Sequence, residues 1–345
     1  MRKLCLGLLL LVAVQVNAQK TNYKLSIIGF YNLENFYDTV DNALIDDAEF
    51  LPSGDKNYNS AIYWDKVKNL ATVISQMGAD KSTDGPAILG VAEIENDTVL
   101  HDLVKHPLIK SRNYQIVHYN SPDARGIDVG LLYNPKYFKV LASKNLYVNL
   151  PGGSKDAYYT RDVLWVKGLF DGEIIHIYVN HWPSRRGGEV RSAPGRAAAA
   201  LVSKKHMDSI IAVDGLQKFV LMGDLNDDPI SPSLTKVLGA KGNIEKVEKG
   251  GYYNPWVEMY KNGIGTLAYQ DAWGLFDQII ITSPWLEKQQ KGYFFFQQHI
   301  FNKEFMVENA GKYKGYPMRT WDGNTYRSGY SDHFPTYITL LRKID

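Results

Sequence analysis

The chain has 345 residues, with 39 basic and 37 acidic side chains and a single cysteine. One cysteine cannot form an internal disulfide framework, and a net charge of +2 provides no global field that would hold the chain on nucleic acid. No segment after residue 20 is long and apolar enough to cross a membrane. The composition therefore excludes a disulfide-stapled module and a transmembrane anchor, and any binding of a polyanion must come from a local patch.

The N-terminal segment has the pattern of a secretory signal peptide over residues 1–18. Two basic residues precede an apolar run over 4–14, and Val16-Asn17-Ala18 is a small-residue cleavage pattern. The only cysteine, Cys5, lies at the start of the apolar run and not at the cleavage point, which argues against a lipoprotein anchor. Cleavage near Ala18 would remove two basic residues and leave a chain with no net charge. We therefore expect an exported protein, either periplasmic or extracellular.

The remaining chain, residues 19–345, is expected to form one domain, because no linker, low-complexity tract or repeat interrupts it. Apolar runs and helical spacing predict, in chain order, a strand at 23–30, a helix at 65–77, a strand at 87–92, a helix at 99–108, strands at 114–119, 127–133, 138–148, 162–170 and 173–179, a helix at 197–211, and strands at 218–222, 276–281 and 335–341. Asp171-Gly172 between two runs signals a β-hairpin. This mixture favours two mostly antiparallel sheets, packed face to face and covered by helices.

Hard polar side chains stand where buried strands end or begin. The five segments are Asn32-Leu33-Glu34, Glu93-Ile94-Glu95, Asn180-His181, Asp224-Leu225-Asn226 and Ser331-Asp332-His333. A turn would explain one such segment, because Asp and Asn bond local backbone. Five segments rich in oxygen donors and poor in Lys instead favour a site for a hard divalent cation such as Mg²⁺. The sequence contains no zinc-type spacing, phosphate-binding GxxxxGK[ST] loop or GxSxG motif.

Seven motifs in order resemble the endonuclease/exonuclease/phosphatase superfamily, the metal-dependent phosphoesterases related to deoxyribonuclease I. They are NLENFYD (32–38), GVAEIEN (90–96), DARGIDVGLLYN (123–134), NHWPSR (180–185), GDLNDDP (223–229), FDQIIIT (276–282) and SDHFP (331–335). The resemblance covers almost all of residues 19–345, and two of the motifs are similar to the forms in secreted bacterial members. It implies an α/β fold: a four-layer sandwich of two packed mixed β-sheets flanked by helices.

The resemblance also implies a metal site. Glu93 matches the metal-binding glutamate, Asn32 a neutral contact to the metal or its water, and Asp332 a residue near the metal. The expected ion is Mg²⁺, with Mn²⁺ or Ca²⁺ as alternatives. The family usually has Gln before the glutamate, whereas this chain has Ala92, so no contact from that position carries over. Glu34 and Glu95 are expected on the same sides of their strands, as supporting residues.

The catalytic residues that the resemblance implies are Asp224, Asn226, His181, His333 and Asp277. Asp224 would orient the attacking water, and Asn226 would position it or donate to a phosphoryl oxygen. His333 would stabilise the phosphate, with Asp277 holding it protonated, and His181 would contact the phosphate or protonate the leaving oxygen.

Three further residues are candidates for substrate binding: Arg125, Asp128 and Arg185. Arg125 and Asp128 lie in the RGIDVGLLY stretch, and Arg185 directly follows the His181 strand. Arg makes bidentate contacts to phosphate, although a solvated loop with ion pairs explains Arg185 about equally well. Asp227 and Asp228 are expected to form a turn before Pro229.

The sequence leaves three functions open. The first is a secreted nuclease that cleaves phosphodiester bonds by metal-assisted direct attack of water. The second is a phosphatase or phosphodiesterase acting on a lipid, inositol or sugar phosphate, and the third is a binding module without catalysis. The intact set of expected site residues argues against the third. Nucleic acid is the expected substrate, and the chain is expected to be a monomer without an obligate protein partner.

Overall fold

Two six-stranded β-sheets form the centre of the structure. The computed structural model describes residues 22–151 and 159–344, so the signal peptide predicted for residues 1–18 lies outside the described part. Sheet A has the strand order β13-β16-β1-β2-β4-β3, and sheet B has the order β5-β6-β7-β8-β12-β9. Each sheet contains one parallel neighbour pair, β1 with β2 and β7 with β8, among antiparallel ones. The sheets are therefore mixed, as the family resemblance implies.

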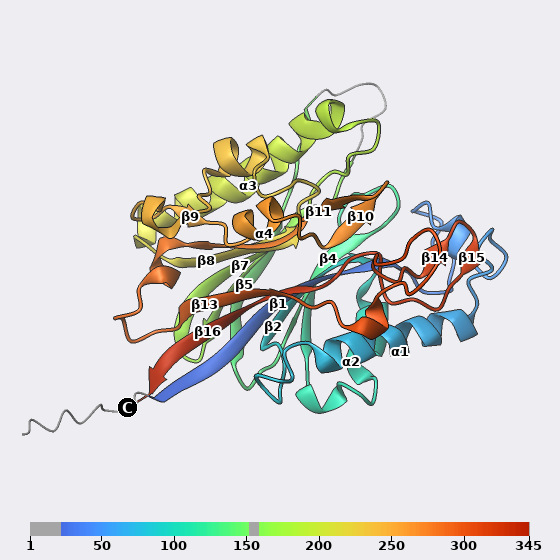
Figure 1. The fold of residues 1–345 in the computed structure, drawn as a ribbon, viewed down its shortest axis with the longest axis horizontal. Helices are drawn as coiled ribbons and strands as arrows, with labels where there is room; N and C mark the ends of the chain where they lie inside the picture. Colours follow the sequence, from blue (N-terminus) through green and yellow to red (C-terminus); the bar gives the residue numbers. More distant parts are fainter. Residues whose placement is uncertain (1–21, 152–158, 345) are drawn as a thin grey trace, which may run out of the picture.

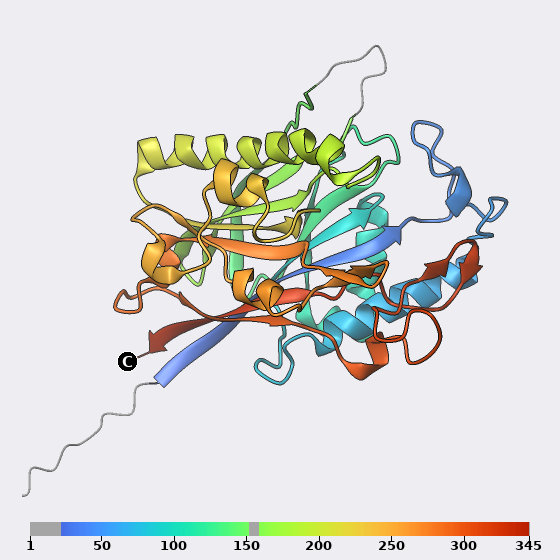
Figure 2. The same ribbon diagram turned by 45° about the horizontal axis from the view of Figure 1, so that its top comes forward.

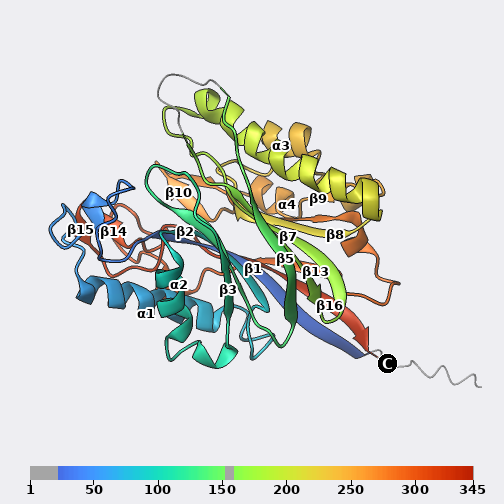
Figure 3. The same ribbon diagram turned by 180° about the vertical axis from the view of Figure 1, so that it is seen from behind.

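Sheet A combines strands from both ends of the chain. Its strands are β1 (Asn22–Phe36), β2 (Ile88–Ile94), β3 (Gln115–His118), β4 (Asp128–Tyr133), β13 (Phe294–Ile300) and β16 (Thr336–Ile344). The first and last of these, β1 and β16, pair in antiparallel register from Asn22 with Ile344 to Phe30 with Thr336. Figures 1 and 3 show these two strands side by side where they leave the body of the molecule.

Sheet B comes from the middle of the chain and contains the expected hairpin. Its strands are β5 (Phe138–Leu146), β6 (Val163–Phe170), β7 (Glu173–His181), β8 (Lys218–Asp224), β9 (Tyr252–Tyr253) and β12 (Asp277–Thr282). Phe170 pairs with Glu173 across Asp171-Gly172, and both turn residues have positive φ, at 46° and 86°. Positive φ at both central positions is what a two-residue hairpin loop of type I′ requires.

Helices cover the outer faces of both sheets. Figure 1 shows α3 (Glu189–Asp214) along sheet B and α1 (Ser60–Gln76) with α2 (Asp97–Lys105) along sheet A. Figure 2 shows α3 extended across its sheet. The remaining elements are α4 (Val257–Lys261), two ribbons, β10 (Leu267–Tyr269) with β11 (Ala272–Gly274) and β14 (Trp321–Asp322) with β15 (Thr325–Tyr326), and helical turns at 48–50, 110–112, 233–238, 244–246, 283–286 and 304–306. The four-layer α/β sandwich is thereby confirmed.

Three apolar cores separate the four layers. The middle core lies between the sheets, and the outer two lie under α1 with α2 and under α3. Successive residues of β8 alternate between cores: Phe219 and Leu221 pack toward α3, whereas Val220 and Met222 pack between the sheets. Because both faces of the strand are buried, its sequence is a continuous apolar run instead of an alternating one.

The helices begin where the sequence supplies a cap or a buried anchor. Asn59 and Asn96 cap α1 and α2 by accepting bonds from backbone N–H groups. Helix α3 begins at Glu189, eight residues before the expected position, and includes Pro194. Its first turns are fixed by Arg196, which is fully buried and pairs with Asp227 at 2.6 Å. None of the helices within 22–151 and 159–344 combines the length and apolar character of a membrane span.

Candidate active site

Four strands bring polar residues to one edge of the sandwich. The strands β1, β2, β7 and β8 continue further than the sequence indicated, so the polar residues occupy their last positions and not the loops behind them. The parallel pairs place like ends together: Asn32 pairs with Ala92, and His181 with Asp224. The amide of Asn32 donates from Nδ2 to Asp224 Oδ2 at 3.0 Å, which joins the two sheets at this edge.

Irregular backbone aims these side chains. The pairing shifts between Ala92 and Ile94, so Glu93 is an extra residue in β2, and its φ is +60°. A similar shift follows Asn32 in β1, where Glu34 and Asn35 also have positive φ. Bulges of this kind redirect side chains and are common beside active sites. Glu34, Asn35 and Glu93 thus depart from the regular strand alternation assumed from sequence.

Because of these bulges, the supporting acids do not join the centre. Glu34 accepts a bond from Thr320 N at 2.7 Å, and Glu95 accepts one from Asp38 N at 2.7 Å. Glu93, in contrast, keeps one oxygen on Asn35 N at 2.8 Å and turns the other toward His181. Glu34 and Glu95 would lie on the same sides as Asn32 and Glu93 only if the strands alternated regularly. The bulges in β1 and β2 interrupt that alternation.

One cluster has the donors for a divalent cation. Glu93 Oε1 lies 3.8 Å and Asp224 Oδ2 3.5 Å from His181 Nε2. One ligand atom from each of the three residues lies within 4.8 Å of the others. The two carboxylate oxygens suit Mg²⁺ or Mn²⁺, which retain waters at their other positions, whereas the imidazole nitrogen is a ligand typical of transition metals. The donor set therefore fits a divalent cation. It includes His181 and Asp224, which were expected to be catalytic, and Asn32 lies beside it through its bond to Asp224.

Asp224 is held by groups on both of its oxygens. Asn32 Nδ2 donates to Oδ2, and the backbone N of Asn226 donates to Oδ1 at 3.0 Å. Burial raises the pKa of the Asp224 carboxyl to about 7, although the charge of His333 and the bond from Asn226 act against this shift. In the ion-free site this carboxylate can accept a proton near neutral pH, and a cation bound beside it would lower its pKa. Asn226 itself is fixed through Nδ2, which donates to Trp182 O at 3.0 Å.

The two site histidines are in opposite electrostatic surroundings. Burial disfavours the charged ring of His333, but Asp277 and Asp224 outweigh it and raise its pKa well above the usual range. Burial lowers the pKa of His181 well below its usual range, and Arg161 and Arg125 add to that effect. His333 is therefore the cationic ring of the site and His181 the neutral one. A neutral His181 suits contact with a cation or phosphoryl oxygen better than protonation of a leaving group.

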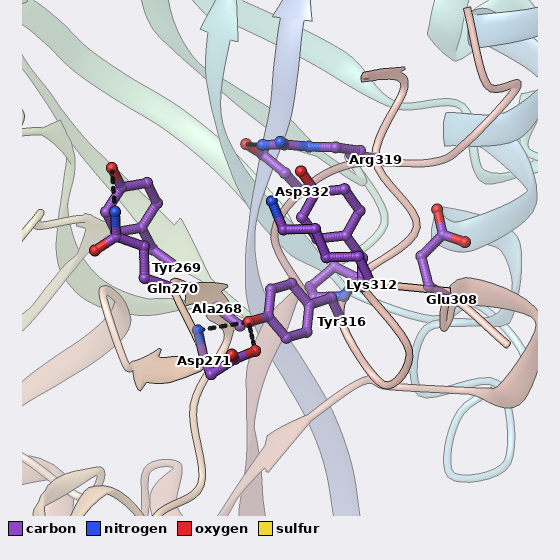
Figure 4. Close-up of a pocket in the computed structure, with 11 residues that line it drawn as sticks. Ala268, Tyr269, Gln270, Asp271, Glu308, Lys312, Tyr316, Arg319 and Asp332 are labelled. Carbon is purple, nitrogen blue, oxygen red and sulfur yellow. Dashed lines mark hydrogen bonds and ion pairs between the residues drawn. The ribbon is translucent and has the colours of Figure 1, made fainter. Parts of the chain in front are cut away.

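Asp332 lies beside His333, outside the cluster of Glu93, His181 and Asp224. Its Oδ1 is 3.9 Å from His333 Nε2, and its Oδ2 accepts a bond from Arg319 at 3.0 Å. It also lines a cavity of about 310 Å³ between the β10–β11 ribbon and the 308–319 segment. Figure 4 shows Arg319 and Asp332 beside each other at one end of this cavity. Asp332 thus connects the candidate active site to that cavity.

The three substrate-binding candidates have different surroundings. Asp128 is buried, and it contacts His118 Nε2 at 3.0 Å and accepts a bond from Ser121 N at 2.8 Å, so it fixes the loop before β4. Arg125 is half exposed in its side chain and lies 3.9 Å from Asp123 Oδ1. Arg185 stacks over the ring of Phe276, with its guanidinium carbon 4.6 Å from the ring centroid.

The acids after Asp224 have a larger role than a turn. Asp228 Oδ2 accepts a bond from Arg185 Nη2 at 2.9 Å, and Asp227 pairs with the buried Arg196. Residues 229–230 do form a turn, but the two acids before them anchor the NHWPSR loop and the start of α3. Sequence reasoning missed this because the partners are some thirty to forty positions away along the chain.

A buried arginine supports the site from behind. Arg161 donates to His181 O at 3.2 Å and Trp182 O at 2.7 Å, and it pairs with Asp123 at 3.1 Å. In the sequence Arg161 is one of several arginines, and no local pattern distinguishes it from the others. Two further cations near the site were not selected from the sequence. Lys66 Nζ donates to Thr320 Oγ1 at 2.8 Å, and Arg319 donates to Asp332.

The comparisons with known proteins show the family and the fold of the chain. A family model described as the Endonuclease/Exonuclease/phosphatase family matches residues 27–342. A search of curated proteins found no match. Similar solved structures include a mannosyl-6-phosphatase of Bacteroides thetaiotaomicron, with 14% identity over 91% of this chain and 99% of that chain and a TM-score of 0.56.

Two eukaryotic structures are also similar. D. rerio TDP2, solved with a single-strand DNA product, has 13% identity over 92% of this chain and 98% of that chain, with a TM-score of 0.54. The human Nocturnin catalytic domain, solved with a bound sulfate, has 13% identity over 94% and 98%, with a TM-score of 0.51. At these identities the structural likeness supports the shared fold.

Proposed function

Because the chain belongs to the endonuclease/exonuclease/phosphatase family, we propose that it hydrolyses phosphoric esters by direct attack of water, with a divalent cation held by Glu93, His181 and Asp224. The proposal rests on the position of Asp224, which belongs to the donor cluster and also lies next to His333. Asp224 Oδ2 lies 3.5 Å from His181 Nε2 and 3.9 Å from His333 Nε2. A phosphate here would contact a cation site, a base and an imidazolium together.

Each residue has a defined task in the proposed reaction. Asp224, oriented by Asn32 and Asn226, holds a water and accepts its proton. His333, charged and fixed by Asp277, donates from Nε2 to a phosphoryl oxygen on which charge develops. A bound Mg²⁺ or Mn²⁺ supplies positive charge that polarises the phosphoryl group and stabilises the leaving oxygen.

For the substrate we propose nucleic acid first, cleaved at phosphodiester bonds. A cavity of about 1020 Å³ lies beside the site and includes Arg185, Arg186, Tyr260 and Trp273 in its lining. Arginines and aromatic faces are the groups that single strands use for backbone and base contacts. We also propose that the protein is exported, because residues 1–18 have the sequence pattern of a secretory signal peptide.

A substrate panel tests the activity and its dependence on the cluster. Purified protein is assayed with plasmid DNA, single-stranded oligonucleotides and small phosphate esters, in Mg²⁺, Mn²⁺ and EDTA. We expect hydrolysis that EDTA abolishes, with losses of about 10³-fold or more in Asp224→Asn and Glu93→Gln. Glu95→Gln, two residues from Glu93, is the matched control and should retain activity. Activity that persists in EDTA and in both variants would contradict the proposal.

A further inference from the structure

The β10–β11 ribbon forms one wall of the cavity of about 310 Å³ that Asp332 lines, and it contacts the segments that carry the proposed catalytic residues. Thr266, just before the ribbon, accepts a bond from Phe334 N at 2.7 Å through its carbonyl oxygen, and its hydroxyl accepts one from Asp277 N at 3.4 Å. Trp273 in β11 stacks on Phe334, with ring centroids 6.2 Å apart and planes at 15°. Phe334 directly follows His333, so the ribbon is fixed in place beside the phosphate-contacting side chain.

The opposite wall of the cavity is the 308–319 segment, and the two walls touch. Glu308 and Tyr316 are joined by a bond from Glu308 N to Tyr316 O at 2.9 Å, which closes the segment on itself. The Tyr316 hydroxyl donates to Asp271 Oδ1 at 2.6 Å and accepts from Asp271 N at 2.7 Å. Figure 4 shows this link across the cavity, with Tyr269 and Arg319 on either side. The space is therefore enclosed between two mutually braced elements.

The lining is aromatic and rich in carboxylates. Tyr269, Tyr313 and Tyr316 contribute rings and hydroxyl groups, and three carboxylates, Asp271, Glu308 and Asp332, stand beside two cations. Arg319 is paired with Asp332, and Arg327, outside the lining, is paired with Glu308 at 3.5 Å. The carboxylates accept bonds from hydroxyl groups and the rings stack on an apolar face, whereas Asp271, which has no ion-pair partner among the described residues, opposes a second phosphate through like-charge repulsion. These are the properties of a site for an uncharged polyhydroxylated ring.

Size and position agree with that chemistry. A volume of about 310 Å³ is at the small end for ligand sites, enough for one ring with its substituents and too small for a duplex. The cavity reaches Asp332, whose Oδ1 is 3.9 Å from His333 Nε2. A ring bound there would thus place an attached phosphate at His333 and Asp224.

We propose that this cavity binds one sugar ring that carries the scissile phosphate ester, which restricts the enzyme to exposed sugar phosphates. The inference rests on the proposed phosphoesterase activity and narrows its substrate. Two sources have the required chemistry: a free sugar phosphate and the terminal nucleotide of a nucleic acid strand. An internal linkage in a closed strand has sugars and further phosphates on both sides, which a cavity of about 310 Å³ cannot hold together.

The experiment compares substrates that differ only in whether an end is exposed. Wild-type protein with Mg²⁺ is given a linear single-stranded oligonucleotide, the circular form of the same strand, and a series of pentose and hexose phosphates. Release of terminal nucleotides from the linear strand alone identifies a nucleic acid end as the source, and release of phosphate from a sugar phosphate identifies the free sugar. Cleavage of the circle at the rate of the linear strand overturns the proposal.

Substitutions then test the cavity itself. Tyr269→Ala should lower kcat/KM at least about 5-fold on the preferred substrate, mainly through KM, because a lost stacking face weakens binding more than chemistry. Tyr147→Ala, another exposed tyrosine, is the matched control. Asp271→Asn keeps an acceptor for Tyr316 and should improve kcat/KM about 2- to 5-fold for a substrate with a second phosphate. Equal effects of Tyr269→Ala and Tyr147→Ala overturn the assignment of the cavity.

A binding measurement separates this inference from the proposed activity. Calorimetric titration of the Asp224→Asn variant with the preferred sugar phosphate should show binding that the additional Tyr269→Ala substitution weakens at least about 5-fold. Binding unchanged by Tyr269→Ala, with wild-type hydrolysis intact, contradicts the subsite alone. Wild-type protein that hydrolyses none of the substrates contradicts the proposed function and the subsite with it.

Discussion

The Nδ1 atom of His333 lies 2.7 Å from Oδ2 of Asp277, and both side chains are buried. This bond fixes the ring so that Nε2 faces Asp224, 3.9 Å away. The other oxygen of Asp277, Oδ1, has no hydrogen-bond partner within residues 22–151 and 159–344, so the bond to His333 is the side-chain contact that holds this carboxylate. Removing that charge should change the protonation of His333 while leaving the fold in place.

The substitution Asp277→Asn tests this relationship through the pH profile of hydrolysis. The folded pKa of His333 is raised, so its charged form persists to high pH, and activity that needs this form declines only on the alkaline side. Without the carboxylate the pKa falls, so the alkaline decline should move to lower pH, and kcat should drop about 10²-fold or more. The exposed Asp80→Asn serves as the control. An alkaline limb that stays in place in Asp277→Asn would rule out this role.

Loss of Glu93 should abolish the thermal stabilisation that a divalent cation provides. A ligand that binds only the folded state raises stability in proportion to the logarithm of its concentration over its Kd, about 2.7 kcal/mol at 100 Kd. Differential scanning fluorimetry with Mn²⁺ should show a rise in Tm for wild type and for Glu95→Gln, whose carboxylate bonds Asp38 N. Glu93→Gln should show little or none. Equal shifts in the two variants would place the cation elsewhere.

Arg161 should be important for stability as well as for the site. Its guanidinium is buried, pairs with Asp123 and holds the carbonyl groups of His181 and Trp182. Lysine keeps the charge but cannot make three directed bonds, so Arg161→Lys should lower the free energy of unfolding by about 2–4 kcal/mol. Urea unfolding measures this, with the exposed Arg186→Lys expected within about 0.5 kcal/mol of wild type. A loss no greater than that of Arg186→Lys would remove the anchoring role.

A histidine far from the site should make the fold sensitive to acid. Burial, with Lys167 and His206, lowers the pKa of His176 to about 4, whereas the unfolded value is near 6.5. The unfolded chain therefore binds the proton first, so stability falls as pH drops from about 6.5 to about 4, by about 1–2 kcal/mol at pH 5. His176→Gln should flatten this part of the stability–pH curve, and His101→Gln on α2 should not. Identical curves for His176→Gln and wild type would refute the assignment.

Much of the fold could be predicted because most strands have a recognisable sequence pattern. Strands buried on both faces, such as β8, read as unbroken apolar runs, and Asp171-Gly172 fixes the hairpin between β6 and β7. The start of α3 could not be predicted from local signals, since Pro194 suggests a break. Its first turns depend on the pair between Arg196 and Asp227, a long-range contact with no local pattern.

The sequence indicated which residues come together at the candidate site, but not how their side chains are oriented. The strand-end pattern singled out Asn32, Glu93, His181 and Asp224, and the structure brings all four together. Strand alternation could not say which of them face a cation, because the bulge at Glu93 breaks it. The β10–β11 ribbon was missed entirely, since three-residue strands give too short a pattern to register.

The pairing of the first and last strands has a consequence for how the protein is made. β1 lies between β16 and β2, and Ser331 Oγ donates to the carbonyl oxygen of Asn32, 299 positions earlier. The ribosome thus releases β1, β2 and β4 long before the strand that completes the sheet exists. Until residues 336–344 emerge, β1 exposes an unpaired edge at the future active site. A nascent chain held short of β16 should consequently remain without hydrolytic activity and prone to aggregate.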